Sequence, residues 1–412
     1  MTLINVTGKD AQGVTSALTQ ILSHYNVNIL DVGQSVIHKS LSLGLLIESP
    51  EETKINGSFS HALFTDLSSK AESLNLNINF TAVSKQDYES WVLQQGKEKH
   101  IVTLLAEKIT AQHLARVTEV VAEHHFNIEE VSRLSGRISL DAEQKCHAAS
   151  VQFTLSGDVS DVSAMHANFL KLGQELDLDI AIQEDNLYRR SRRLVCFDMD
   201  STLIQVEVID ELAKAAGVGE QVAAITESAM RGEIDFSESF RQRMALLEGM
   251  DESVLQKIAE SLPITNGAAR LIKHLRHFGY KVAILSGGFN YFANHLKEKL
   301  GIDYVYANQL DFENGKLTGK VKGDIVDGKM KAKLLTKLAA DLGISTEQVI
   351  AVGDGANDLP MLALAGLGIA FQAKPIVTEQ AQHSINRLGL DAILYLLGMR
   401  DRELNALENL NN

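Results

Sequence analysis

The first 185 residues show one order of hydrophobic and polar positions twice. In the first copy, residues 1–85, apolar runs predict strands and apolar residues at helical spacing predict helices, in the order β-α-β-β-α-β. The expected elements are a strand at Leu3–Val6, a helix carrying Val14 to Tyr25, strand-like runs at Val27–Val32, Ser35–His38 and Leu43–Ile47, a helix near 58–73 and a strand at Leu76–Val83.

The second copy, residues 99–185, repeats this order, and Phe126-Asn127-Ile128 corresponds to Val27-Asn28-Ile29 of the first. No acid, nucleophile or metal-ligand cluster recurs between the copies, so neither is expected to be catalytic. The elements expected here are a strand at Ile101–Leu105, a helix carrying Leu114 to Val121, strands at Phe126–Val131 and Ala148–Leu155, a helix carrying Val162 to Phe169 and a strand at Leu178–Gln183.

The second half alternates apolar strands with helical patterns, which predicts a parallel sheet with helical crossovers. Polar clusters follow three of its strands: Asp198 and Asp200, then Ser286 to Phe289, then Gly353 to Asp358. The carboxyl ends of parallel strands border one crevice, so these clusters are expected to meet there. Asp198 and Asp200 would point to the same side if the strand at 194–197 extended that far.

These residue types indicate phosphate chemistry with a hard metal ion. Ser286 followed by two glycines offers a hydroxyl and open backbone N–H groups to a phosphate oxygen. Asp198, Asp354 and Asp358 form an oxygen-only set, which favours Mg²⁺. Lys331 is one lysine among several at the head of a helix, and from the residues alone its role stays open. The two common glycine-rich nucleotide motifs are missing from the sequence.

Together, Asp198-Met-Asp200-Ser-Thr202, Ser286-Gly-Gly, Lys331 and Gly353-Asp-Gly-Ala-Asn-Asp358 resemble the four motifs of the haloacid dehalogenase-like phosphohydrolases. The resemblance implies an α/β fold over residues 194–400, with a Rossmann-like parallel sheet and a helical cap at about 206–265. A closer signature is similar to that of the phosphoserine phosphatase family. Its residues are Glu207, Met230, Phe236, Arg243 and the run 352–358.

That resemblance implies Mg²⁺-dependent hydrolysis of O-phospho-L-serine, the last step of serine biosynthesis, through an aspartyl phosphate. Asp198 would be the nucleophile and Asp200 the general acid and base. The metal ligands would be Asp198, the main-chain carbonyl of Asp200, and Asp354, with Asp358 supporting them. The residues expected to bind substrate are Glu207, Met230, Phe236, Arg243, Ser286, Gly287, Lys331 and Asn357.

The repeats resemble a tandem pair of ACT domains, ferredoxin-like modules that bind amino acids and pair between subunits. The resemblance rests on the element order, the turn from Gly8 to Gly13, and Asn28. It implies a homodimer and makes L-serine a candidate effector, bound through Asp10, Gly13 and Asn28. The second copy has no glycine between Glu107 and Gln112, which puts a second ligand site in doubt.

Charge and composition narrow the class of protein. Lys and Arg number 39 against 53 Asp and Glu, a net charge of −14, which argues against nonspecific nucleic-acid binding. The basic run Arg189, Arg190, Arg192, Arg193 is interpreted as a solvated linker within the polar boundary 184–193. Cys146 and Cys196 form neither a metal pair nor a disulfide framework, and Cys196 is expected to be a small buried hydrophobe.

Targeting signals are not expected. Met1 to Asp10 lacks the features of a signal peptide, and no apolar stretch reaches the roughly 18 residues of a membrane helix. The protein is therefore predicted to be cytoplasmic. Two alternatives to hydrolysis stay open at this stage: phosphotransfer to another alcohol such as homoserine, and an amino-acid sensor whose phosphatase half is inactive.

Overall fold

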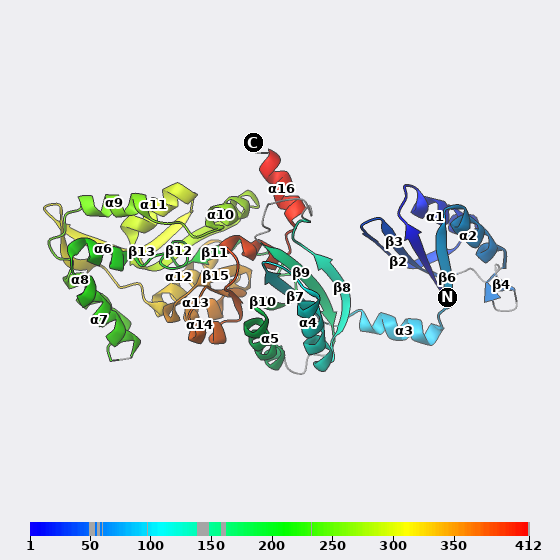
Figure 1. Ribbon diagram of the computed structural model, residues 1–412, viewed down its shortest axis with the longest axis horizontal. Coiled ribbons are helices and arrows are strands. Elements are labelled where there is room, and N and C mark those ends of the chain that lie inside the picture. The colour runs from blue at the N-terminus through cyan, green and yellow to red at the C-terminus, as the bar shows by residue number, and fades with distance from the viewer. Residues whose placement is uncertain are drawn as a thin grey trace. The chain divides into compact units, whose positions relative to one another are not determined.

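The computed structural model describes residues 1–48, 54–55, 58–59, 61–96, 98–137, 148–157, 162–231 and 233–410. The chain forms two compact units, Met1–Lys97 and Glu98–Asn412. The second unit contains both the second repeat and the seven-stranded sheet (Figure 1).

The first unit has the predicted β-α-β-β-α-β order. Its four-stranded antiparallel sheet runs β2-β3-β1-β6, and α1 and α2 bury Leu18, Leu22 and Leu63 in a core with Ile4 and Val6. The two strand-like runs at 27–38 form one strand with an irregularity between Ile29 and Asp31. The elements are β1 Thr2–Lys9, α1 Val14–His24, β2 Asn28–Ile37, β3 Ser40–Glu48, β4 Lys54–Ile55, β5 Ser58–Phe59, α2 His61–Ser73, β6 Leu76–Ala82 and α3 Lys85–Gln94.

The second repeat has the same architecture, which confirms the prediction of a duplicated unit. Its sheet order, β10-β7-β9-β8, places equivalent strands in the same neighbourhoods as in the first unit. Thr110 caps α4 by accepting a hydrogen bond from His113 N at 3.2 Å. The elements are β7 Lys99–Ala106, α4 Ala111–Glu123, β8 Asn127–Arg133, β9 Ala149–Ser156, α5 Val162–Leu176 and β10 Asp179–Glu184.

The second half folds into the predicted α/β sheet, in the order β14-β13-β12-β11-β15-β16-β17. Central strand β11 (Leu194–Phe197) pairs in parallel with β12 and β15, and all four of its residues are buried. The other elements of this sheet and its helices are α10 Ala268–His277, β12 Lys281–Phe289, α11 Asn290–Leu300, β13 Tyr304–Glu313, β14 Lys316–Lys322, α12 Gly328–Asp341, β15 Val349–Gly353, α13 Leu359–Leu364, β16 Leu367–Phe371, α14 Pro375–Gln380, β17 His383–Ile385, α15 Ile393–Leu396 and α16 Asp401–Leu410.

Alternate residues of β11 enter two different cores, one on each face of the sheet. Val195 and Phe197 join the core that contains α10 and α11, whereas Leu194 and Cys196 join the one that contains α12 and α13. Burial on both faces explains the continuous apolar run that the sequence shows. Cys196 is free and fully buried, as expected, and burial raises the pKa of its thiol.

The insert between β11 and β12 is helical, as predicted for the cap. It contains α6 Val208–Ala216, α7 Gly219–Met230, α8 Phe236–Ala245 and α9 Ser253–Ser261. The hairpin of β13 and β14, which the sequence did not indicate, supports it, because Gly249 N donates to Leu317 O at 2.8 Å. Phe240 and Leu247 of the cap are buried in the same core as Leu317.

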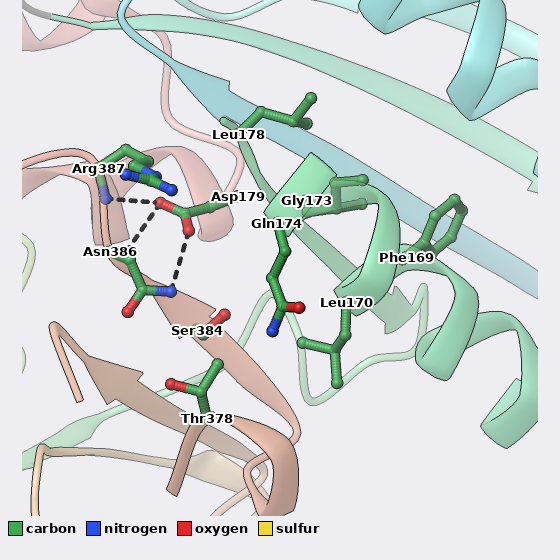
Figure 2. A pocket seen from close by; sticks show the side chains of 11 residues that line it. Phe169, Leu170, Gly173, Gln174, Leu178, Asp179, Thr378, Ser384, Asn386 and Arg387 are labelled. Carbon is green, nitrogen blue, oxygen red and sulfur yellow. Dashed lines mark hydrogen bonds between the residues drawn. The ribbon is translucent and has the colours of Figure 1, made fainter. Parts of the chain in front are cut away.

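The second repeat and the catalytic sheet are joined by buried polar contacts (Figure 2). Asp179 of β10, which is 4% exposed, accepts hydrogen bonds from Asn386 N at 2.9 Å and Arg387 N at 3.0 Å. Gln183 Nε2 donates to Leu396 O at 3.0 Å. The interpretation of 189–193 as a solvated linker is wrong for Arg189 and Arg192. Both are buried at this junction, where Arg192 donates to main-chain oxygens and Arg189 forms an ion pair with Asp185.

In the described part of the chain, no helix combines the length and the apolar character that a membrane crossing requires. Cys146 lies outside the described residues.

Candidate active site

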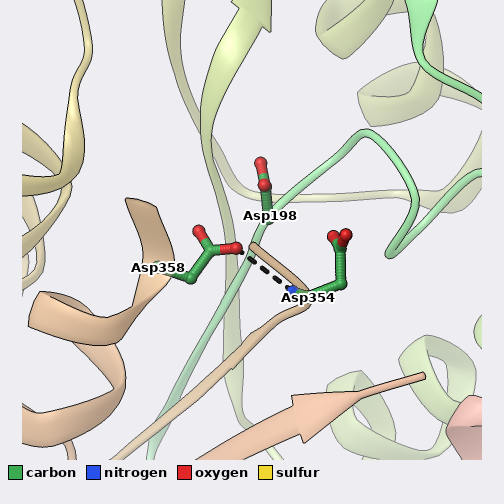
Figure 3. A group of neighbouring side chains, drawn as sticks. All are labelled: Asp198, Asp354 and Asp358. Atoms are coloured by element: carbon green, nitrogen blue, oxygen red, sulfur yellow. Dashed lines mark hydrogen bonds between the residues drawn. The ribbon is translucent and has the colours of Figure 1, made fainter. Parts of the chain in front are cut away.

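Three carboxylates meet at the carboxyl end of the central strands. Asp198 follows β11, Asp354 follows β15, and Asp358 lies in the short helical turn Ala356–Asp358. One ligand atom from each lies within 4.8 Å of the others (Figure 3). The neighbouring parallel strands end at the same edge, so residues 156 positions apart along the chain become neighbours.

Lys331 brings a buried positive charge to this cluster. Its Nζ lies 2.9 Å from Asp198 Oδ2 and 2.6 Å from Asp358 Oδ1, and its side chain is inaccessible to solvent. The lysine is placed by the start of α12, where Asp327 caps the helix by accepting from Met330 N at 2.8 Å. Although burial alone would lower the pKa of Lys331, the two carboxylates raise it, so the ammonium stays charged.

Both carboxylate oxygens of Asp358 bind neighbouring groups of the site. Its Oδ1 pairs with Lys331, and its Oδ2 accepts from Asp354 N at 3.1 Å and Gly355 N at 2.9 Å. A Cβ at Gly353 would lie 2.4 Å from Asp358 Cγ, so only glycine fits beneath this carboxylate. This arrangement suits a supporting carboxylate better than a direct metal ligand.

The carboxylates are crowded enough to favour protonation. Burial and the charge of Asp198 raise the pKa of Asp354 to about 8 and that of Asp358 to about 7. Asp354 Oδ1 accepts from Thr202 Oγ1 at 2.9 Å. A set of hard oxygen donors whose ionised forms repel one another fits a divalent cation of the Mg²⁺ type.

Asp200 lines the same cavity as Asp198 and Asp354. Strand β11 ends at Phe197, so the condition under which strand alternation would point Asp198 and Asp200 to the same side is not met. Residues 199–203 form a turn in which Ser201 has φ 54°. Val208 N donates to Asp200 Oδ1 at 3.0 Å. Burial, followed by the charges of Glu207 and Asp198, raises the pKa of Asp200 well above its ordinary value.

The Ser286-Gly287-Gly288 segment lies on the last residues of β12, which continues to Phe289. Ser286 is buried, and its Oγ accepts from Gly288 N at 2.9 Å. A Cβ at Gly288 would lie 2.4 Å from Asp200 Oδ2, so this glycine permits the close approach of the two segments.

Sequence reasoning missed Asn308 of β13, which holds this segment. Its Nδ2 donates to Gly287 O at 2.8 Å, and its Oδ1 accepts from Val326 N at 2.9 Å. The side chain is 2% exposed. The only signal in the sequence is an amide that follows the run Tyr304–Ala307, and nothing there identifies its partners.

A cavity of about 910 Å³ opens between these strand ends and the cap. The cap supplies Glu207, Phe236 and Arg243 to its wall, and the core supplies Asp198, Asp200, Ser286, Gly287, Asp354 and Asn357. Met230 ends α7, but its side chain lies outside the described part of the structure. Lys331 lies beneath the cavity rather than in its wall.

The cap side of the cavity carries opposite charges. Glu207 Oε1 accepts from Ser201 Oγ at 2.7 Å. Burial lowers the pKa of Arg243, while the charges of Glu207 and Asp210 act in the opposite direction. Arg243 Nε donates to Ser239 O at 3.4 Å. No carboxylate of the described residues forms an ion pair with it, so the remaining N–H groups can bind a ligand.

The residues considered for an effector do not form one site within the first unit. Asn28 pairs with Glu48 at one end of the sheet, whereas Lys9, beside Asp10, pairs with Ser40 at the other. At about 3.3 Å per residue, the length of β3 separates them by more than 20 Å. Gly13 precedes α1 with φ 88°, on the same side as Asp10. Asp10, Gly13 and Asn28 are all exposed.

Both halves of the chain are similar to known protein families. A family model for haloacid dehalogenase-like hydrolases matches residues 192–366, and a model for ACT domains matches residues 1–81. A phosphoserine phosphatase of Streptomyces coelicolor is 38% identical over 408 residues, which cover 99% of this chain and 94% of that protein. A phosphoserine phosphatase of Haemophilus influenzae is 51% identical over 236 residues, which cover 57% of this chain and 75% of that protein.

Solved structures that resemble this chain are of the same kind of protein. A probable phosphoserine phosphatase from Vibrio cholerae, in unliganded form, is 35% identical with a TM-score of 0.58, covering 74% of this chain and 87% of that one. A HAD family hydrolase from Salmonella enterica serovar Typhi is 30% identical with a TM-score of 0.62, covering 72% of this chain and 98% of that one. Similarity that extends over almost the whole of this chain and of its Streptomyces relative shows that the protein belongs to the phosphoserine phosphatase family of haloacid dehalogenase-like hydrolases, with an ACT domain in residues 1–81.

Proposed function

We infer that this chain hydrolyses O-phospho-L-serine to L-serine and phosphate in a catalytic domain at 194–400, capped by residues 206–265. One observation carries the inference: Asp198 and Asp354, with Lys331 behind them, lie at the core side of a cavity whose cap side presents the carboxylates of Glu207 and Asp210 and one guanidinium, Arg243. A substrate that carries a phosphate, an ammonium and a carboxylate matches all three positions.

Arg243 and Glu207 are proposed to recognise the amino-acid part of the substrate. The guanidinium of Arg243 would bind the substrate carboxylate in a bidentate manner, and Glu207 would accept a hydrogen bond from the substrate ammonium. Phe236 would cover the aliphatic carbon, since its ring lies close to Gly287, where a Cβ would meet Phe236 Cζ at 3.0 Å. Met230 and Asn357 are proposed to complete this wall.

Asp198 is proposed to attack phosphorus and form an aspartyl phosphate, because its carboxylate needs no base to act as a nucleophile. Asp200, whose pKa is raised, would protonate the departing seryl oxygen and later accept a proton from the attacking water. Lys331, Ser286 and the N–H group of Gly287 would stabilise the negative charge on the transferred phosphoryl group.

The oxygen donors fit Mg²⁺, which supplies positive charge to the phosphoryl oxygens when bound. Asp198, the main-chain carbonyl of Asp200 and Asp354 are proposed as ligands. Asp358 is proposed as their support, since both of its oxygens already accept hydrogen bonds.

Phosphate release from three substrates tests this function. O-phospho-L-serine should be hydrolysed in the presence of Mg²⁺ and not in the presence of a chelator. Phosphoethanolamine lacks the carboxylate and 3-phosphoglycerate lacks the ammonium. Each should lose about 2–4 kcal/mol in kcat/KM, because one buried charge is left unpaired. Equal efficiency on all three would show that Glu207 and Arg243 do not recognise the substrate.

The ACT half is proposed to bind L-serine between two copies of the chain. Asp10 and Gly13 of one copy could meet Asn28 only if a second copy supplies it, which favours a homodimer. The edge strand β2 supports this pairing, because Ile29, Val32, Val36 and Ile37 are exposed along it.

Calorimetric titration of the full chain with L-serine tests the effector proposal. Asp10→Ala should remove a serine site that remains in Glu72→Ala, a control that changes an exposed carboxylate of the same domain. Both variants keep the active site, so product binding there contributes equally to both titrations. Indistinguishable titrations would leave dimerisation as the role of this half.

A further inference from the structure

A second cavity lies between the second repeat and the catalytic sheet, away from the active site. Its volume is about 450 Å³. Ile182 and Gln183 of β10 and His166 of α5 form one side of it, and Arg192, Gly366 and His383 form the other. None of these residues lines the active-site cavity.

The floor of this cavity is polar and buried. Arg192, Gln183 and His383 are 3%, 6% and 5% exposed. Each carries a buried polar atom that has no hydrogen-bond partner among the described residues: Arg192 Nε, Gln183 Oε1 and His383 Nδ1. Buried polar groups in proteins are nearly always satisfied, so three such atoms around one cavity indicate a missing partner.

The charge of Arg192 is also unpaired. Its guanidinium donates to two main-chain carbonyls, Arg189 O at 3.3 Å and Gly366 O at 3.1 Å, which leaves other N–H groups free. No carboxylate of the described residues lies within ion-pair distance of it. Burial and the nearby charge of Arg189 lower the pKa of Arg192 to about 10, so the group remains a cation at neutral pH.

The neutral imidazoles add hydrogen-bonding capacity without opposing charge. Burial lowers the pKa of His383 to about 3, and burial also lowers the pKa of His166. The two rings lie 6.5 Å apart between centroids, edge to face. The carboxylates that line the cavity, Glu184 and Glu347, are exposed at its rim, where water screens their charge.

We propose that this cavity is a binding site for a small oxyanion, a carboxylate or a phosphate, held by Arg192 and the His166–His383 pair. An anion here would pair the buried guanidinium and accept a hydrogen bond from Arg192 Nε, and from His383 Nδ1 in the tautomer that carries its proton there. Gln183 Oε1 is an acceptor, so its partner would be a protonated oxygen of the anion or a water molecule. A bidentate contact between a buried guanidinium and an anion is directional and charge-assisted.

Calorimetric titration of the full chain with inorganic phosphate, and separately with acetate, tests the proposal. The comparison is between Arg192→Met, which keeps the aliphatic stem, and Arg193→Met, which removes the neighbouring exposed arginine. Both variants retain the active site, so anion binding there is common to both. We expect Arg193→Met to bind one more anion per chain than Arg192→Met, or to bind it at least about tenfold more tightly.

The phosphate and acetate arms identify the preferred class of oxyanion. His166→Gln, a half-buried change on the opposite wall, should weaken the same site and keeps the test valid if Arg192→Met does not fold. Identical titrations of Arg192→Met and Arg193→Met with both anions would overturn the proposal. If Arg192→Met does not fold, identical titrations of His166→Gln and Arg193→Met would overturn it.

Discussion

The carboxylate of Asp198 is held from two directions. Lys331 Nζ lies 2.9 Å from Oδ2, and Met199 N donates to Oδ1 at 2.7 Å. Lys331 also pairs with Asp358 at 2.6 Å, so its charge stays compensated when Asp198 is neutralised. The position can therefore lose its charge without leaving the lysine buried and unpaired.

We expect Asp198→Asn to fold normally and to lose turnover by roughly 10³-fold or more, because the amide keeps the shape but is a poor nucleophile. Phosphate release measures the loss, and the thermal unfolding midpoint checks the fold. Acid-quenched wild-type enzyme should carry a labile phosphate on residue 198. Turnover like that of the wild type in the variant would remove Asp198 from the nucleophile role.

His383 gives a prediction about acidic conditions. Its folded pKa, lowered to about 3, lies below the value of about 6.5 expected in the unfolded chain. Between these values the unfolded state binds one proton that the folded state does not. Stability therefore falls as the pH drops below about 6.5, by at most about 1.4 kcal/mol per pH unit from this residue.

We expect His383→Gln to show a shallower loss of unfolding free energy between about pH 6.5 and 4.5 than the wild type. Urea unfolding at a series of pH values measures both slopes. His277→Gln, a change on the last turn of α10, serves as control and should leave the slope unchanged. Equal slopes in wild type and His383→Gln would mean that this imidazole is accessible to protons in the folded state.

At the level of elements, strand β10 is attached to the loop after β17 by Asp179. Its carboxylate accepts from two main-chain N–H groups and from Asn386 Nδ2. Burial raises the pKa of Asp179, so part of the benefit of these hydrogen bonds is offset by the cost of burying the charge. The donors would have no acceptor if the carboxylate were removed.

We expect Asp179→Ala to lower the free energy of unfolding of the second unit by about 2 kcal/mol, since buried N–H groups are left unsatisfied. Asp177→Asn is the control, because Asp177 is 77% exposed, pairs with Arg387 at the surface and has φ 60°, which asparagine tolerates. Its effect should be much smaller. Denaturant unfolding separates the two, and equal losses would contradict the role of burial at Asp179.

Regular alternation made most elements predictable. The repeats, the parallel strands and the helical character of the insert follow from periodicity, whereas its role as a cap came from the family resemblance. The strand ends indicated that Asp198 and Asp354 would meet. The hairpin of β13 and β14 was missed because its strands mix apolar and polar residues without clear alternation. Arg189 and Arg192 were misjudged because arginine is mostly exposed, and only the packing of the second repeat buries them. Asn308 acts through partners that the sequence does not identify.

On the scale of the whole molecule, the boundary between compact units does not coincide with the boundary between repeats and catalytic half. Leu105, Leu134 and Ala181 of the second repeat belong to the same hydrophobic core as Val195 and Phe197. Asp401 also accepts from Gly136 N at 2.6 Å, which ties the start of α16 to the repeat. The second repeat therefore contributes to the stability of the catalytic sheet.

We expect a fragment of residues 98–412 to fold and to keep phosphatase activity within a few-fold of the full chain, because it retains this shared core. A fragment of residues 186–412 keeps every proposed active-site residue but exposes the apolar surface that the second repeat covers. It should unfold at a lower denaturant concentration or aggregate, since exposed apolar area costs about 25 cal/mol per Å². Activity assays and urea unfolding of both fragments, at matched concentration, measure the difference. Equal stability of the two would show that the second repeat is an independent domain that only touches the catalytic sheet.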